Sequence, residues 1–135
     1  MHFVYGPIQS YIHTAFRIAV GLMFFTNGAA KLFAWFGREE AVDLMTRFGV
    51  AGVLETFGGL LIVFGLFTRP TAFILSGQMA VAYFWIHGSR GLFWWANGGE
   101  RAALYSWAFL LLAAFGAGAL SLDGWLAKRK AIPAD

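Results

Sequence analysis

Apolar residues fall into four long stretches, separated by short polar or glycine-rich segments. The stretches run over residues 11–33, 49–67, 70–87 and 102–122. Each is close to the about 20 apolar residues that an α-helix needs to cross the hydrocarbon core of a bilayer. The pattern predicts an all-α chain, an integral membrane four-helix bundle with up-down-up-down connectivity, folded as a single domain over residues 1–135.

The segments between the stretches support these boundaries. Pro70 suits the first turn of the third helix, where its missing N–H costs nothing. The one well-charged loop, "GREEAVDLMTRFG" at 37–49, carries Val42, Met45 and Phe48 at a spacing of three. This spacing is typical of a short helix lying in the membrane interface over residues 38–48. A solvated loop is the alternative, and the pattern does not decide between the two.

Composition identifies the solvent in which such a chain folds. Hydrophobic residues make up 59% of the 135 residues and charged residues 13%, whereas soluble domains have about 45–50% and about 25%. A chain this short cannot bury so much apolar surface in its own core. The lipid bilayer is therefore expected to be its first partner.

The charged residues indicate topology rather than nucleic acid binding. The formal charge is +3, but the basic residues are scattered and form no groove with interleaved aromatic rings, so no nucleic acid partner is expected. Four spans place both termini on one side. The "KRK" cluster at 128–130 follows the last span directly and favours cytoplasmic termini.

Ionisable and polar residues within the spans define a candidate site, because charges at membrane depth are costly and usually face the bundle interior. With a rise of about 1.5 Å per residue, Lys31 lies roughly 28 Å and Glu55 roughly 18 Å from the side bearing the termini. Most of the other polar residues converge on the same half of the bundle. The predicted ligand-binding or buried polar network comprises Arg17, Asn27, Lys31, Glu55, Tyr83, His87, Glu100 and Tyr105.

Pairing within this network has several solutions. Arg17, roughly 8 Å deep, and Gln78, at about 12 Å, form a thinner layer near the termini. Glu55 can pair with Arg17, with Lys31, or with both. The network can be purely structural or part of a ligand or redox site, and Arg17 and Lys31 can instead reach the headgroups. We expect Lys31 to point inward toward Glu55.

Several kinds of chemistry are not expected. The chain has no cysteine, which removes thiolate metal sites and iron–sulfur ligation. His2, His13 and His87 do not face one another at one depth, so a haem held by this chain alone is not expected. No His and carboxylate spacing indicates a metal site, and we expect no covalently bound cofactor.

Three segments together carry a resemblance to a known family. The first is "RIAVGLMFFTNGAAKLF", with Arg17, Gly28 and Lys31. The second is "LETFGGLLIVFGLFTRPTA", which begins near Glu55. The third is "NGGERAALYSWAFLLLAAFGAGALSLD", which ends at Asp123. In this order they resemble the DoxX family of small four-helix membrane proteins, although relatives often have a histidine where this chain has Asn27.

The resemblance implies a bacterial cytoplasmic (inner) membrane location and a function linked to redox systems. Some relatives are subunits associated with quinone-linked oxidoreductases, so the chain is predicted to be an accessory or quinone-interacting subunit of a membrane-associated redox system. It is not expected to be catalytic alone. A quinone or a lipid is the expected ligand. The expected partners are a membrane or redox protein and a second copy of the chain. The alternative is a non-catalytic assembly or anchoring module whose buried charges are structural.

Overall fold

The computed structural model describes residues 6–131, and within that range every regular element is helical. The prediction of an all-α chain is confirmed. Four helices are long: α1 (Pro7–Phe33), α2 (Arg47–Phe64), α3 (Thr68–Val81) and α5 (Glu100–Phe115). Four elements are shorter: a π-helix η1 (Ala82–His87), a 3-10 helix η2 (Gly88–Arg90), α4 (Trp94–Asn97) and α6 (Leu122–Ala131).

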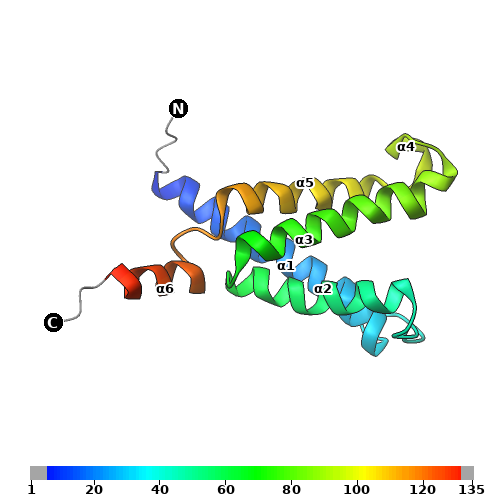
Figure 1. Ribbon diagram of the computed structural model, residues 1–135, viewed down its shortest axis with the longest axis horizontal. Helices are drawn as coiled ribbons and strands as arrows, with labels where there is room; N and C mark the ends of the chain where they lie inside the picture. Colours follow the sequence, from blue (N-terminus) through cyan, green and yellow to red (C-terminus); the bar gives the residue numbers. More distant parts are fainter. Residues whose placement is uncertain (1–5, 132–135) are drawn as a thin grey trace.

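The long helices are arranged as two pairs. Helix α1 packs most extensively against α2, and α3 packs against α5. Successive long helices run in alternating directions, and the described ends of the chain lie at the same end of the molecule (Figure 1). At the opposite end the two pairs lie farther apart (Figure 1). This divergence positions the site described below.

Glycines allow α1 and α2 to approach closely. A Cβ atom on Gly28 would lie 2.5 Å from the Thr56 hydroxyl oxygen, and one on Gly59 would lie 2.7 Å from the backbone nitrogen of Phe25. Helices in lipid associate through close packing rather than through hydrophobic exclusion, so small residues at the crossing are favoured. The same contact places the Glu55 turn of α2 directly against α1.

An aromatic cluster joins the two helix pairs. Phe24 of α1 packs edge-on against Phe109, with ring centroids 4.7 Å apart, and lies 5.1 Å from the ring of Tyr105. Ile62 and Leu75 complete this core from α2 and α3, and both are at most 1% exposed. Aromatic pairs in such geometries contribute about 0.5–1.5 kcal/mol beyond their buried area.

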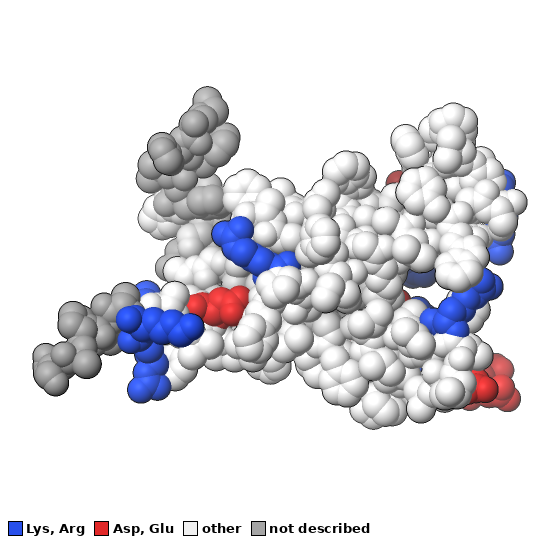
Figure 2. Space-filling model, in the orientation of Figure 1, with Lys and Arg blue, Asp and Glu red and all other residues white. Residues whose placement is uncertain are grey.

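The exterior of the helices is apolar. Phe57, Phe73 and Trp107 are 60%, 66% and 71% exposed, and many other large hydrophobic side chains are also exposed. Charged side chains gather at the two ends of the molecule, with a band free of them between (Figure 2). By length and hydropathy, α2 is the one candidate membrane span among the described residues.

The predicted helix over 102–122 is too long at its C-terminal end. Helix α5 ends at Phe115, and Gly116 follows with φ 79° and ψ −166°, a conformation essentially restricted to glycine. Residues 116–121 are irregular, and α6 begins at Leu122. The break matters because it exposes backbone carbonyls that other side chains then bind.

The predicted interfacial helix over 38–48 is also wrong. Residues 38–46 form turns and bends, and only Arg47 and Phe48 are helical, as the start of α2. The Asp43 carboxylate accepts a hydrogen bond from the backbone N–H of Met45, and the Asp43 carbonyl accepts one from the Thr46 hydroxyl. Short polar side chains that bond locally in this way compete with helix formation. The solvated-loop alternative is the one observed.

Candidate ligand-binding site

A cavity of about 520 Å³ lies between the two helix pairs, at the end away from the described chain termini. Its walls come from the C-terminal half of α1, the start of α2, the end of α3 with η1, and the start of α5. Apolar side chains such as Phe24, Leu54 and Trp85 form most of the surface. Such cavities, with a few convergent polar groups, are typical of small-molecule sites.

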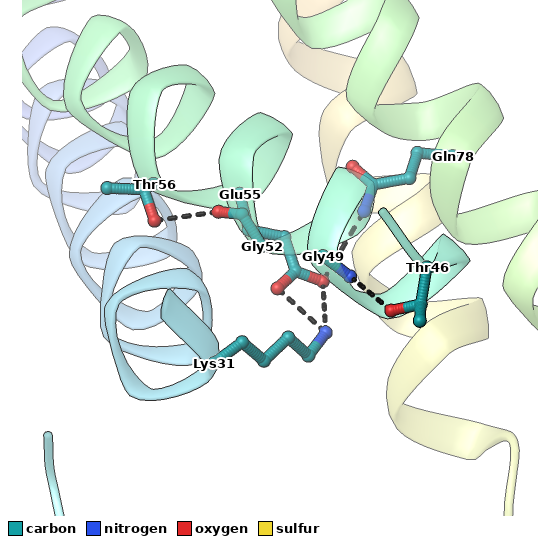
Figure 3. Close-up of polar contacts among 7 residues, drawn as sticks. All are labelled: Lys31, Thr46, Gly49, Gly52, Glu55, Thr56 and Gln78. Carbon is teal, nitrogen blue, oxygen red and sulfur yellow. Dashed lines mark hydrogen bonds and ion pairs between the residues drawn. The ribbon is translucent and has the colours of Figure 1, made fainter. Parts of the chain in front are cut away.

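Lys31 and Glu55 form an ion pair in the wall of this cavity. The Lys31 Nζ atom lies 2.8 Å from both carboxylate oxygens of Glu55. Gln78 of α3 donates a longer hydrogen bond, 3.4 Å, to the same carboxylate (Figure 3). The Glu55 side chain is 3% exposed and that of Lys31 is 24% exposed. The prediction that Lys31 points inward toward Glu55 is confirmed.

Local packing explains why this pair forms. Gly28 lies one turn before Lys31 and leaves room for Glu55 and Thr56 against α1. The Thr56 hydroxyl donates a hydrogen bond to the carbonyl of Gly52, so this hydroxyl is satisfied within α2 and needs no partner from α1 (Figure 3). Thr46 caps α2 by accepting a hydrogen bond from Gly49 (Figure 3). The carboxylate is thus held near the middle of α2, beside a close helix crossing.

Two buried polar atoms in the cavity wall have no hydrogen-bond partner within the described chain. They are Oε1 of Gln78 and Nδ1 of His87. An unsatisfied buried polar atom costs free energy, so each requires an explanation, such as an external partner. His87 ends the π-helix η1, and short π-helical segments occur often at functional sites. The sequence carries no signal for this π-helix.

Positive charge surrounds the cavity. Among the described residues that line it, four are basic and one, Glu55, is acidic. Arg38, Arg47 and Arg101 belong to this basic set and are not among the residues that the sequence predicts for the site. Arg101 lies close enough to Glu55 and Tyr105 for its charge to act on both. Arg47 and Arg101 lie near helix starts and Arg38 lies in the loop after α1. Their location on the same side as Lys31 was visible in the sequence, but their convergence was not.

Five of the eight predicted network residues line the cavity: Asn27, Lys31, Glu55, His87 and Tyr105. Asn27 neighbours the Tyr105 hydroxyl. Two others do not line it. The Tyr83 hydroxyl instead donates to the carbonyl of Leu92, and Glu100 is exposed at the first position of α5. Gln78, predicted to lie with Arg17, belongs to the cavity.

Arg17 lies in a separate cluster, so of the two partners considered for Glu55 the one observed is Lys31 and not Arg17. Its guanidinium donates to the carbonyls of Ala117, Leu120 and Val63, and the residue is 2% exposed. The carbonyls of Ala117 and Leu120 are available because the chain is irregular after α5, and that of Val63 is available because α2 ends at Phe64. Arg17 therefore ties α1 and α2 to the segment 116–121 at the end that bears the termini.

The same end gathers the other residues of the sequence motifs. The Asp123 carboxylate accepts hydrogen bonds of 2.9 Å from the backbone N–H groups of Phe67 and Thr68, and so caps α3. Arg69 donates 2.7 Å to the carbonyl of Ala114 near the end of α5. The presence of Arg17, Arg69 and Asp123 in these motifs is thus explained by contacts between helix ends. These contacts are structural rather than part of the cavity.

The fold and the cavity together define a small helical protein with an apolar exterior and a largely apolar internal cavity, lined by more basic than acidic side chains. A comparison with family models matches DoxX over residues 12–88. The chain belongs to the DoxX family. No solved structure matches it.

Several similar proteins are known by sequence. A protein of Haemophilus influenzae is 46% identical over 90% of this chain and 95% of its own length. Inner membrane protein YqjF of Escherichia coli K12 is 34% identical over 84% of this chain and 90% of its own. Inner membrane protein YphA of the same organism is 31% identical over 90% and 95%. The family and these two names support the predicted association with a lipid bilayer.

Proposed function

We propose that this protein spans the bacterial inner membrane several times and is an accessory subunit of a membrane-associated redox system, with a quinone or a lipid as the ligand of its cavity. In this proposal α1, α2, α3 with η1, and α5 form an up-down-up-down bundle across the bilayer. The exposed apolar side chains on all four support this arrangement. The names of YqjF and YphA support the inner membrane as the location.

The observation that carries the ligand-binding role is the cavity itself. It combines aromatic and aliphatic walls with a buried ion pair and two buried polar atoms, on Gln78 and His87, that lack partners in the described chain. The Gln78 oxygen needs a donor, which a hydroxyl of a reduced quinone or of a lipid head group supplies. The His87 nitrogen can donate to a carbonyl oxygen or accept from a hydroxyl, according to its tautomer. The amide of Asn27 and the hydroxyl of Tyr105 offer further hydrogen bonds to it. Since the chain has no cysteine, the proposal assigns electron transfer to a partner protein.

The direct test is the ligand content of the purified protein. The membrane protein is extracted in a mild neutral detergent, and co-purifying quinones and lipids are quantified by mass spectrometry. We expect a stoichiometric ligand that is lost in Asn27→Leu/Tyr105→Phe but kept in Trp107→Leu, which alters only the exposed exterior. Quinone-dependent oxidation in membranes should fall in the same variant. A protein free of ligand, with membrane oxidation unchanged in that variant, would refute the proposal.

A second candidate function is a non-catalytic assembly or anchoring module. The Lys31–Glu55 contact favours it, because an ion pair between α1 and α2 can serve helix register alone. The ligand experiment separates the two. If Glu55→Gln destabilises the protein while the oxidation rate per folded molecule stays constant, the charges are structural.

The proposed topology places both termini in the cytoplasm and the cavity on the periplasmic side. The basic residues Lys128, Arg129 and Lys130 end α6 and fit the cytoplasmic side. Because the chain lacks cysteine, Glu39→Cys and Lys130→Cys each introduce a single thiol. A membrane-impermeant thiol reagent should label Glu39→Cys in intact spheroplasts and Lys130→Cys only after lysis. The reverse pattern would invert the topology.

A further inference from the structure

We infer that the cavity recognises an acidic amphiphile, a molecule with a carboxylate or phosphate head and an apolar chain. This inference rests on the proposed ligand-binding role of the cavity, and it narrows the two ligand classes named there. It follows from the charges around the cavity and from the position of its apolar walls.

The first step concerns charge balance. Both carboxylate oxygens of Glu55, the one acidic side chain among the described lining residues, are bound by Lys31. Arg38, Arg47 and Arg101 remain, and none has a carboxylate within ion-pair distance in the part of the chain that the structure describes. All three are exposed, and the Arg38 side chain also donates a hydrogen bond to the carbonyl of Glu40. Guanidinium groups at the mouth of an apolar cavity attract an anionic head group. A neutral ligand would form no ion pair with them.

The second step concerns where these groups lie. Arg38 comes from the loop after α1, Arg47 begins α2, and Arg101 lies in the first turn of α5. They therefore approach the cavity from both helix pairs. Figure 2 shows basic side chains around the notch between the pairs at this end. Guanidinium groups bind carboxylates and phosphates through paired hydrogen bonds.

The third step concerns positioning within this basic set. The Arg47 guanidinium lies 5.2 Å from the Phe48 ring centroid and 5.6 Å from that of Trp85, so it bridges α2 and η1. The buried Nδ1 atom of His87, on the same wall, lacks a partner in the described chain. An imidazole nitrogen in the appropriate tautomer donates a hydrogen bond. An acidic head group would accept it.

The fourth step concerns the apolar chain of the ligand. Val50 and Leu54 of α2 and Val81 of α3 line the cavity and are also exposed, as is Trp85. The cavity wall is thus continuous with the apolar exterior between these two helices. A head group held by the arginines can extend its hydrocarbon chain along this surface toward the bilayer. An amphiphile would therefore contact both the arginines, through its head group, and the apolar wall, through its hydrocarbon chain.

Binding of matched probes to the purified protein in maltoside detergent tests this inference. Oleate, methyl oleate, oleoyl lysophosphatidic acid, inorganic phosphate and a short-chain quinone are titrated by calorimetry. We expect at least one of the two acids to bind about tenfold or more tightly than the methyl ester, the effect of one charged hydrogen-bonded contact. Oleate alone would indicate a carboxylate ligand, and the lysophosphatidic acid alone a phosphate ligand. Binding of both would support the shared chemistry.

Variants then assign the effect to the cavity. Arg47→Gln and Arg101→Gln should each weaken binding of the acid by about tenfold, again one charged contact. Arg90→Gln, an exposed arginine at the same end that does not line the cavity, should change it less than twofold. Thermal unfolding verifies that each variant is folded. The comparison of acid with ester needs only the unaltered protein.

Four results would overturn the inference. Equal affinity for oleate and methyl oleate would show that the cavity does not recognise the charge of the head group. Binding of inorganic phosphate as tightly as either amphiphile would remove the role of the tail. Binding of the quinone without either acid would refute an acidic ligand while leaving the proposed function intact. Binding of none of the probes would also overturn it, and co-purification of a quinone or lipid would then show whether the proposed function survives.

Discussion

Lys31 of α1 holds both carboxylate oxygens of Glu55 on α2, each at 2.8 Å, but the two partners are not equally buried. The Glu55 side chain is 3% exposed, whereas that of Lys31 is 24% exposed. The contact therefore joins an almost fully buried carboxylate with a partly exposed amine. Removing one partner or the other should have different consequences.

Lys31→Met should destabilise the protein more than Glu55→Gln does. The first change leaves a buried carboxylate without its counter-ion, which costs about 3–5 kcal/mol. The second leaves an amine that can turn toward water or headgroups. Thermal unfolding in detergent, with a double variant to complete the cycle, measures both. Equal losses would show that the burial difference has no energetic consequence.

Gly28→Ala should separate α1 from α2. The added Cβ would lie 2.5 Å from the Thr56 hydroxyl oxygen and 2.8 Å from the Glu55 carbonyl carbon, and overpacking of this kind costs about 1–3 kcal/mol. Gly77→Ala in α3 is the matched control, because a Cβ there meets nothing within 4 Å and alanine favours a helix by about 1 kcal/mol. Unfolding midpoints of the two variants should shift in opposite directions. A stabilised Gly28→Ala would contradict the close crossing.

Arg17→Lys should be poorly tolerated even though charge is kept. The guanidinium of Arg17 reaches three carbonyls in two segments, those of Ala117, Leu120 and Val63, and one ammonium cannot reproduce that geometry. A loss of about 2 kcal/mol is expected, from two hydrogen bonds to a charged group weakened or lost. Arg69→Lys is a control at the same end, because its side chain is exposed where it binds Ala114. It should lose less than half as much.

The sequence predicted the positions of the long helices and the Lys31–Glu55 contact well, for one physical reason. A helix rises by a fixed amount per residue, so depth along a bundle can be counted from the helix ends. The same counting placed Gln78 too near the termini. Helix α3 begins at Thr68 rather than Pro70, which moves Gln78 about 3 Å deeper. The length of the Gln78 side chain spans the remaining distance to Glu55.

The errors arose where the backbone leaves the regular helix. A glycine in an apolar run can indicate either close helix packing or the end of a helix. Gly116 alone therefore does not predict that α5 ends at Phe115. The Arg17 contacts with Ala117 and Leu120 depend on that break. The convergence of Arg38, Arg47 and Arg101 depends on the shape of loops between helices, which hydropathy does not encode. Fold class was thus predictable and the charge distribution of the cavity was not.

Asp123→Ala should loosen the end of the molecule that bears the termini without changing the cavity. Its carboxylate accepts hydrogen bonds from the N–H groups of Phe67 and Thr68 at the start of α3, and loss of such a cap costs about 0.5–2 kcal/mol. The backbone N–H of Asp123 also donates 2.8 Å to the carbonyl of Gly65, and this contact remains in the variant. Limited proteolysis should therefore cleave the segment 116–121 faster in Asp123→Ala, while ligand retention stays as in the unaltered protein.

Asp43→Ala in the α1–α2 loop serves as the control, because its carboxylate bonds only to nearby Met45. Unchanged cleavage of 116–121 in Asp123→Ala would show that the remaining contacts hold this segment in place.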